Sequence, residues 1–104
     1  MATNDLPNLP KKEFLIMGLL VANAGKRMYG LELVEKSNGE LKKGTIYVTL
    51  ARLKSKGYVT SEREEEKPGI ATPRRLYKVT GEGAKVFRAL ERVGGAAWLK
   101  EAMA

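Results

Sequence analysis

Residues 44–60 read GTIYVTLARLKSKGYVT, in which a helix-like pattern passes through a glycine into a strand-like pattern. The apolar residues of the first half recur at i, i+4 and i+7, the spacing of a stripe on one face of a helix. They are Ile46, Leu50 and Leu53. Gly57 stands where helices often end in a left-handed residue, and the aromatic and β-branched residues after it favour a strand. The pattern predicts a helix over residues 44–56 followed by a strand over 58–65.

The segments on either side of this stretch complete a short series of elements. Apolar periodicity and turn residues predict two earlier helices, over residues 11–23 and 29–37. Downstream, a loop with proline and glycine at 66–73 separates the first strand from a second over 74–79. Thr80 can then cap a fourth helix. The order helix, helix, helix, hairpin, helix predicts a mainly α fold with a small β-hairpin, namely a winged helix-turn-helix with a C-terminal dimerisation helix.

Composition narrows the classes of function. The 104 residues include 19 Lys and Arg against 12 Asp and Glu, a net charge of +7 that favours a polyanionic partner. His and Cys are absent, which removes disulfides, thiolate metal sites and the usual general base near neutral pH. We expect no enzyme activity, no cofactor and no metal site. The longest apolar run, 14–22, is too short to cross a bilayer, and no signal peptide is recognisable. The expected location is the cytoplasm, in association with the nucleoid.

Residues that point away from the buried stripe would face a DNA duplex. Helical geometry places Val48 and Arg52 outward together with Gly44, and Thr45 and Thr49 on one flank. The N-terminal part of a recognition helix enters the major groove, where threonine can hydrogen-bond to bases and valine can contact a thymine methyl. Arg52 would contact a phosphate or a guanine.

Basic residues before this helix and in the wing extend the predicted surface. The predicted DNA-binding residues are Lys43, Gly44, Thr45, Tyr47, Val48, Thr49, Arg52, Lys67, Arg74 and Arg75. Tyr47 either donates to a phosphate or is half-buried against the second helix. Four glutamates crowd the first wing strand, at Glu62, Glu64, Glu65 and Glu66. Carboxylates repel phosphates, so these residues either pair with arginines across the hairpin or leave the contact to the wing tip.

The helix over residues 11–23 is apolar around nearly its whole circumference. Such a helix is buried on more than one side, either within its own monomer or partly against a second subunit, and both arrangements remain open. The fourth helix also has an apolar face. A homodimer through these two helices would use Phe14, Met17, Val86, Leu90, Val93, Ala97 and Trp98. The chain would then comprise a flexible N-terminal arm (1–10), a DNA-binding domain (11–80) and a dimerisation helix (81–104).

Four short motifs stand out along the chain. They are MYGLEL (28–33), GTIYVTLARL (44–53), GYV (57–59) and RRLYKVT (74–80), the last followed by Gly81 and Gly83. In this order they resemble the second helix, the recognition helix, the start of the wing and the end of the wing in the PadR family of transcriptional regulators. The resemblance runs from about Phe14 to Leu90.

The resemblance implies a dimeric, repressor-type regulator that binds a palindromic operator and is often released by a small effector. In that family the C-terminal helix supplies most of the dimer interface and packs near the first helix of the partner. The chain resembles members with short C-terminal segments. A small-molecule effector would therefore need a pocket at the dimer interface, for example beside Trp98.

Two other functions are compatible with the same pattern. The chain could be an architectural protein that binds DNA without sequence preference, through phosphate contacts alone. It could also be a winged-helix module that binds another protein, although its basic charge counts against that alternative.

Overall fold

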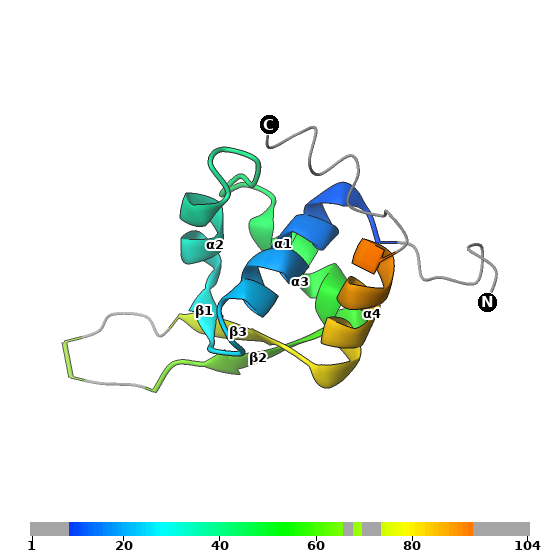
Figure 1. Ribbon diagram of the computed structural model, residues 1–104. Helices are drawn as coiled ribbons and strands as arrows, with labels where there is room; N and C mark the ends of the chain where they lie inside the picture. Colours follow the sequence, from blue (N-terminus) through cyan, green and yellow to red (C-terminus); the bar gives the residue numbers. More distant parts are fainter. Residues whose placement is uncertain (1–8, 66–67, 70–73, 93–104) are drawn as a thin grey trace.

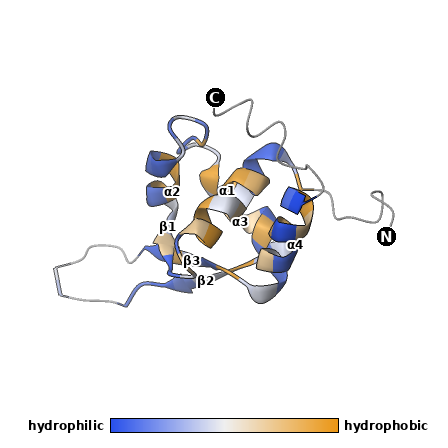
Figure 2. Ribbon diagram, in the orientation of Figure 1, coloured by the Kyte–Doolittle hydropathy of each residue, from blue (hydrophilic) through white to orange (hydrophobic). Residues whose placement is uncertain are grey.

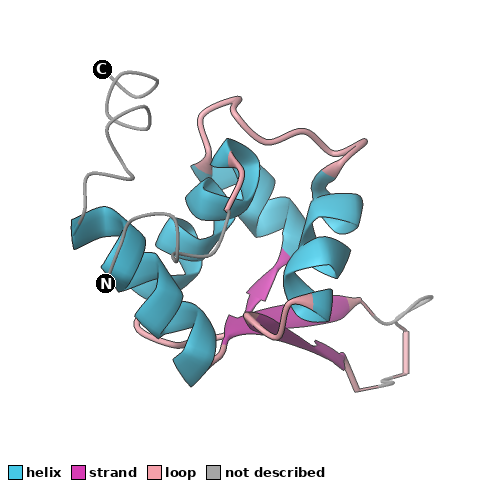
Figure 3. Ribbon diagram, turned by 90° about the vertical axis from the view of Figure 1, so that its right-hand side faces the viewer, coloured by secondary structure: helices cyan, strands magenta, loops and turns pink. Residues whose placement is uncertain are grey.

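The computed structural model describes residues 9–65, 68–69 and 74–92, which contain four helices and a three-stranded antiparallel sheet (Figure 1). In chain order the elements are α1 (Lys11–Ala22), β1 (Met28–Tyr29), α2 (Gly30–Lys36), α3 (Ile46–Ser55), β2 (Val59–Arg63), β3 (Arg75–Val79) and α4 (Gly81–Arg92). The helices pack on one side of the sheet, and the β2–β3 hairpin extends beyond them as a wing (Figure 3). The predicted winged helix-turn-helix is confirmed. No helix of these described ranges is long and apolar enough to cross a membrane.

The sheet contains one strand more than the sequence predicted. β1 pairs with β3, with Met28 opposite Tyr77 and Tyr29 opposite Leu76, so the strand order is β1-β3-β2. The predicted two-stranded hairpin is thereby corrected to a three-stranded sheet, and the second helix begins at Gly30. A strand of two residues has no alternation by which its sequence could be recognised.

Helix α1 lies at the centre of the core, and its side chains pack against α2, α3, α4 and β3. Hydrophobic residues gather on α1 and on the sides of the other elements that face it (Figure 2). Phe14 is 1 % exposed and Met17 is 0 % exposed, and the ring of Phe14 lies 4.7 Å from that of Phe87. Most of the all-round apolar helix is therefore covered within one chain. Phe14 and Met17 leave little surface for a second subunit, and their place at a dimer interface stays a prediction.

The first turn of α4 is fixed to the base of the wing. The Thr80 hydroxyl donates a hydrogen bond to the Gly57 carbonyl (2.8 Å) and accepts one from the Gly83 N–H (2.9 Å). The predicted cap is therefore confirmed. Gly57 has φ +82°, which also confirms the left-handed residue predicted at the end of α3.

The apolar face of α4 is largely used inside the monomer. Val86 and Phe87 are buried in the core, so Val86 also offers little surface to a partner, whereas Leu90 is only partly buried. The remaining predicted dimer residues lie outside the described residues: Val93, Ala97 and Trp98.

A buried ion pair joins the start of α1 to the end of α3. Glu13 is 3 % exposed, and its carboxylate Oε1 lies 2.6 Å from Nζ of Lys56. The side chain of Lys56 keeps 35 % of its surface exposed. The pair was not predicted, because 43 positions separate the two residues along the chain. Lys56 therefore stabilises the fold by pairing with Glu13, although it lies at the end of the predicted recognition helix.

Replacing Lys56 by Met should lower the free energy of unfolding by about 1–3 kcal/mol, because the Glu13 carboxylate would stay buried without its cation. Partial exposure of Lys56 places the effect below that of a fully buried pair. Urea unfolding measures it. The matched control is Lys54→Met, an exposed lysine of the same helix end, with an expected change under about 0.5 kcal/mol. Equal stability of the two variants would contradict this role of Lys56.

Candidate nucleic-acid interface

The outward face of α3 is exposed, as its buried stripe requires. The stripe itself is confirmed as core and consists of Ile46, Leu50 and Leu53. On the opposite side Val48 is 54 % exposed, and Thr45 and Arg52 are exposed with it. The helix begins two residues later than predicted, because a turn closed by the Thr45 N–H and the Lys42 carbonyl (3.2 Å) precedes it. The predicted contacts Lys43 and Gly44 are exposed in that turn.

The two flanking residues of α3 are partly engaged within the protein. The Thr49 hydroxyl donates a hydrogen bond to the Thr45 carbonyl (3.1 Å). The Tyr47 ring packs on the first residue of α2: a β-carbon added at Gly30 would lie 2.7 Å from its Cε1 atom. Tyr47 nevertheless remains 49 % exposed. Of its two interpretations, half-burial against the second helix is the one observed, with enough surface left for an external contact.

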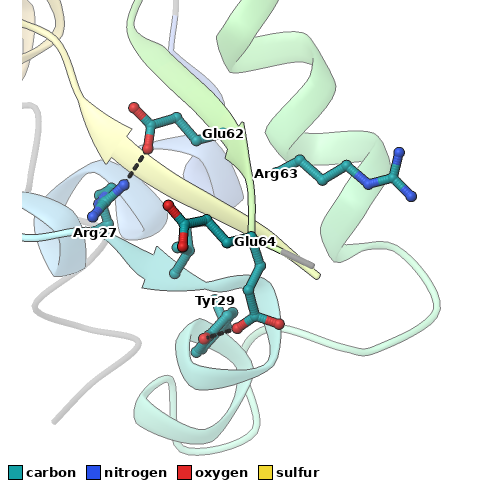
Figure 4. A pocket seen from close by; sticks show the side chains of 7 residues that line it. Arg27, Tyr29, Glu62, Arg63 and Glu64 are labelled. Atoms are coloured by element: carbon teal, nitrogen blue, oxygen red, sulfur yellow. Dashed lines mark hydrogen bonds and ion pairs between the residues drawn. The ribbon is translucent and has the colours of Figure 1, made fainter. Parts of the chain in front are cut away.

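The outer face of the wing sheet, which is turned away from the helices, carries paired charges (Figure 4). Arg27 forms an ion pair with Glu62. The Tyr29 hydroxyl donates to the Glu64 carboxylate. The Arg74 guanidinium lies 3.7 Å from that carboxylate and 4.0 Å from the Tyr29 ring centroid. A wing glutamate thus pairs with an arginine across the hairpin, which is one of the two arrangements predicted.

Arg27 and Tyr29 belong to this cluster but were not predicted from the sequence. They lie beside the wing because β1 pairs with β3, and β1 itself was not predicted. With Leu76 they line a shallow depression on the outer face. The hydrogen bond to Glu64 raises the pKa of Tyr29, and burial and the negative charge of Glu64 act in the same direction. The phenol therefore stays a hydrogen-bond donor at neutral pH.

The inner face of the wing, on the helix side of the sheet, carries two arginines. Arg63 of β2 and Arg75 of β3 lie directly opposite each other in the strand register. Arg75 donates from Nη1 to the Ser61 hydroxyl (3.3 Å). Figure 4 shows Arg63 pointing away from Arg27 and from the outer-face cluster. The wing thus separates two arginine-bearing surfaces.

Tyr77 is a buried residue of β3 on the same face of the strand as Arg75. Burial raises the pKa of Tyr77; the nearby charge of Arg75 opposes this shift and Tyr47 adds to it. Arg75 lies on the inner face of the wing, opposite Arg63, whereas Arg74 lies with the outer cluster. The remaining wing prediction, Lys67, lies outside the described residues.

Comparison with known proteins agrees with this fold. The family model "Transcriptional regulator PadR-like family" matches residues 17–89. A PadR family transcription regulator from Clostridium difficile is 27 % identical, with a TM-score of 0.65 over 86 % of this chain and 91 % of that one. A PadR family transcriptional regulator from Eggerthella lenta is 26 % identical, with a TM-score of 0.65 over 88 % and 81 %.

A PadR-like transcription factor from Bacteroides fragilis is 28 % identical, with a TM-score of 0.62 over 86 % of this chain and 82 % of that one. A search of curated protein sequences gives no significant match. The family match covers most of the 104 residues, including α2, α3 and the wing. The chain belongs to the PadR-like family of transcriptional regulators.

Proposed function

We propose that this regulator is a homodimeric repressor that binds an inverted-repeat operator in double-stranded DNA. One observation carries the proposal: α3 presents Thr45, Val48 and Arg52 to solvent on the side opposite its buried stripe. Threonine and valine suit base edges and thymine methyls, and Arg52, further along the helix, suits a phosphate. Repression would follow from occupation of a promoter.

The proposed dimer joins α1 and α4 of two subunits. These helices pack on each other within the chain, and each keeps a partly exposed leucine, Leu19 and Leu90. These leucines are added to the predicted contacts Phe14 and Met17, which expose little surface of their own. A twofold dimer would place two recognition helices in successive major grooves, about 34 Å or ~10 bp apart. A small-molecule effector at the interface beside Trp98 remains part of the proposal.

Selection of bound sequences from a random duplex pool tests this function. We expect enrichment of an inverted repeat with half-sites ~10 bp apart, because twofold symmetry of the protein imposes the same symmetry on its site. The operator so found should be preferred to random DNA by about 10³-fold or more.

Other outcomes of the selection would favour another function. Binding without enrichment would favour an architectural DNA-binding protein. Absence of DNA binding at low ionic strength would contradict the proposal and leave a protein-binding module as the better explanation.

A further inference from the structure

The two faces of the wing differ in how their arginines are used. On the outer face, Arg27 and Arg74 are each within ion-pair distance of a carboxylate, from Glu62 and Glu64 respectively. Strand alternation places these glutamates on the outer face and Arg63 between them on the inner one. Both arginines of the outer face thus have a carboxylate partner.

Arg63 and Arg75 lie directly opposite each other in neighbouring strands. Like charges in this position repel and destabilise a hairpin. Among the described residues, neither guanidinium has a carboxylate within ion-pair distance; the one hydrogen bond seen is from Arg75 to Ser61. Such a pair becomes favourable when an anion lies between or beside the two guanidinium groups, each of which can donate two parallel hydrogen bonds to phosphate oxygens.

We propose that Arg63 and Arg75 form a two-guanidinium site for backbone phosphates of DNA, and that Arg74 is a positioning residue that does not contact the nucleic acid. The inference rests on the proposed DNA-binding function and refines it. It removes Arg74 from the predicted contacts and adds Arg63, which was not among them.

The inner site is continuous with the recognition helix. Strand β2, which carries Arg63, packs against α3. Tyr47 is half-exposed on α3 next to Val48. A duplex that follows the outward face of α3 would therefore pass the inner face of the wing. The outer face is on the other side of the sheet, away from such a duplex.

Arg74 holds the wing against the start of α2. Its guanidinium lies over the Tyr29 ring and beside Glu64, and the Tyr29 hydroxyl donates to the same carboxylate. Tyr29 is the N-cap residue of α2, and its N–H donates to Glu32 at 2.8 Å. The cluster thus connects the wing to the first helix of the helix-turn-helix, and it would set the orientation of the inner arginines.

The salt dependence of DNA binding separates the two roles, because each phosphate contact adds about 0.9 to the slope of log K against log [salt]. The test compares Arg63→Gln, Arg75→Gln and Arg74→Gln on a duplex of mixed sequence. The first two variants should each lose about 0.9 per subunit from the slope, or about 1.8 for the dimer, and bind all sequences more weakly. Arg74→Gln should weaken binding by about 3- to 10-fold with the slope unchanged, because only orientation is lost.

Two conservative variants sharpen the comparison. Arg75→Lys should restore the slope, since an ammonium also neutralises a phosphate. Tyr29→Phe changes no charge but removes the bond to Glu64, so it should reproduce part of the Arg74→Gln affinity loss with the wild-type slope. Circular dichroism of each variant checks that the fold is kept.

The outcomes distinguish a failure of this inference from a failure of the proposed DNA-binding function. A wild-type protein that binds no DNA at low ionic strength would overturn both. A wild-type protein with salt-dependent binding would overturn this inference alone if Arg74→Gln lost the same slope as Arg75→Gln, or if Arg63→Gln lost none.

Discussion

Replacing Gly83 by Ala is expected to lower the free energy of unfolding by more than about 4 kcal/mol, which is much of the total stability of a small domain. A β-carbon at this position would lie 2.2 Å from the Tyr58 carbonyl oxygen and 2.7 Å from Cε of Met17. The first of these atoms is backbone, directly before β2, and cannot rotate away. The second belongs to a fully buried side chain of α1. The helix could accept the methyl group only by moving off the sheet.

The sign of this effect is informative, because helix propensity alone predicts the opposite. Alanine is favoured over glycine inside a helix by about 1 kcal/mol. Gly81→Ala is the matched control: it lies in the same first turn, and nothing stands within 4 Å of an added β-carbon. We expect Gly81→Ala to be as stable as the wild type or slightly more stable. Thermal and urea unfolding measure both variants, and a Gly83→Ala protein of wild-type stability would contradict the close approach of α4 to β2.

The elements that sequence predicted correctly are those set by local rules. The apolar stripe of α3 follows from helical periodicity, and its three residues are buried in the structure: Ile46, Leu50 and Leu53. The turn at Gly57 and the cap at Thr80 depend on the chemistry of one or two neighbouring residues. These signals mark where α3 ends and where the wing begins and ends. The order of the elements could therefore be predicted from the sequence.

The features that escaped prediction depend on contacts between distant segments. Strand β1 forms only because it pairs with β3, which is distant in the sequence. The hydrogen bond between Tyr29 and Glu64 depends on that pairing. The apolar circumference of α1 could not distinguish a partner subunit from the chain's own helices, so the burial of Phe14 within the chain could not be predicted. The division of the wing arginines needed the strand register, since Arg74 and Arg75 are adjacent in sequence and lie on opposite faces.

Replacing Val48 by Asp is expected to weaken operator binding by more than about 100-fold, equivalent to about 3 kcal/mol. Val48 is the most exposed large apolar residue described and lies in the middle of the outward face of α3. A carboxylate there would enter the negative potential of the major groove and lose the contact with a thymine methyl. The change should hardly affect stability, because aspartate costs a helix only a few tenths of a kcal/mol more than valine at an exposed position.

The matched control for Val48→Asp is Ala24→Asp, which makes the same charge change at an exposed position in the turn after α1, outside the helices of the proposed dimer. Its backbone is in the left-handed region, which aspartate tolerates. If general electrostatic repulsion were responsible, both variants would weaken binding equally, and the effect would vanish at higher ionic strength. A direct role of α3 instead predicts a loss confined to Val48→Asp that persists when salt is raised. Titration of a labelled operator at two salt concentrations distinguishes these cases. Wild-type affinity in Val48→Asp would show that another surface of the chain binds the DNA.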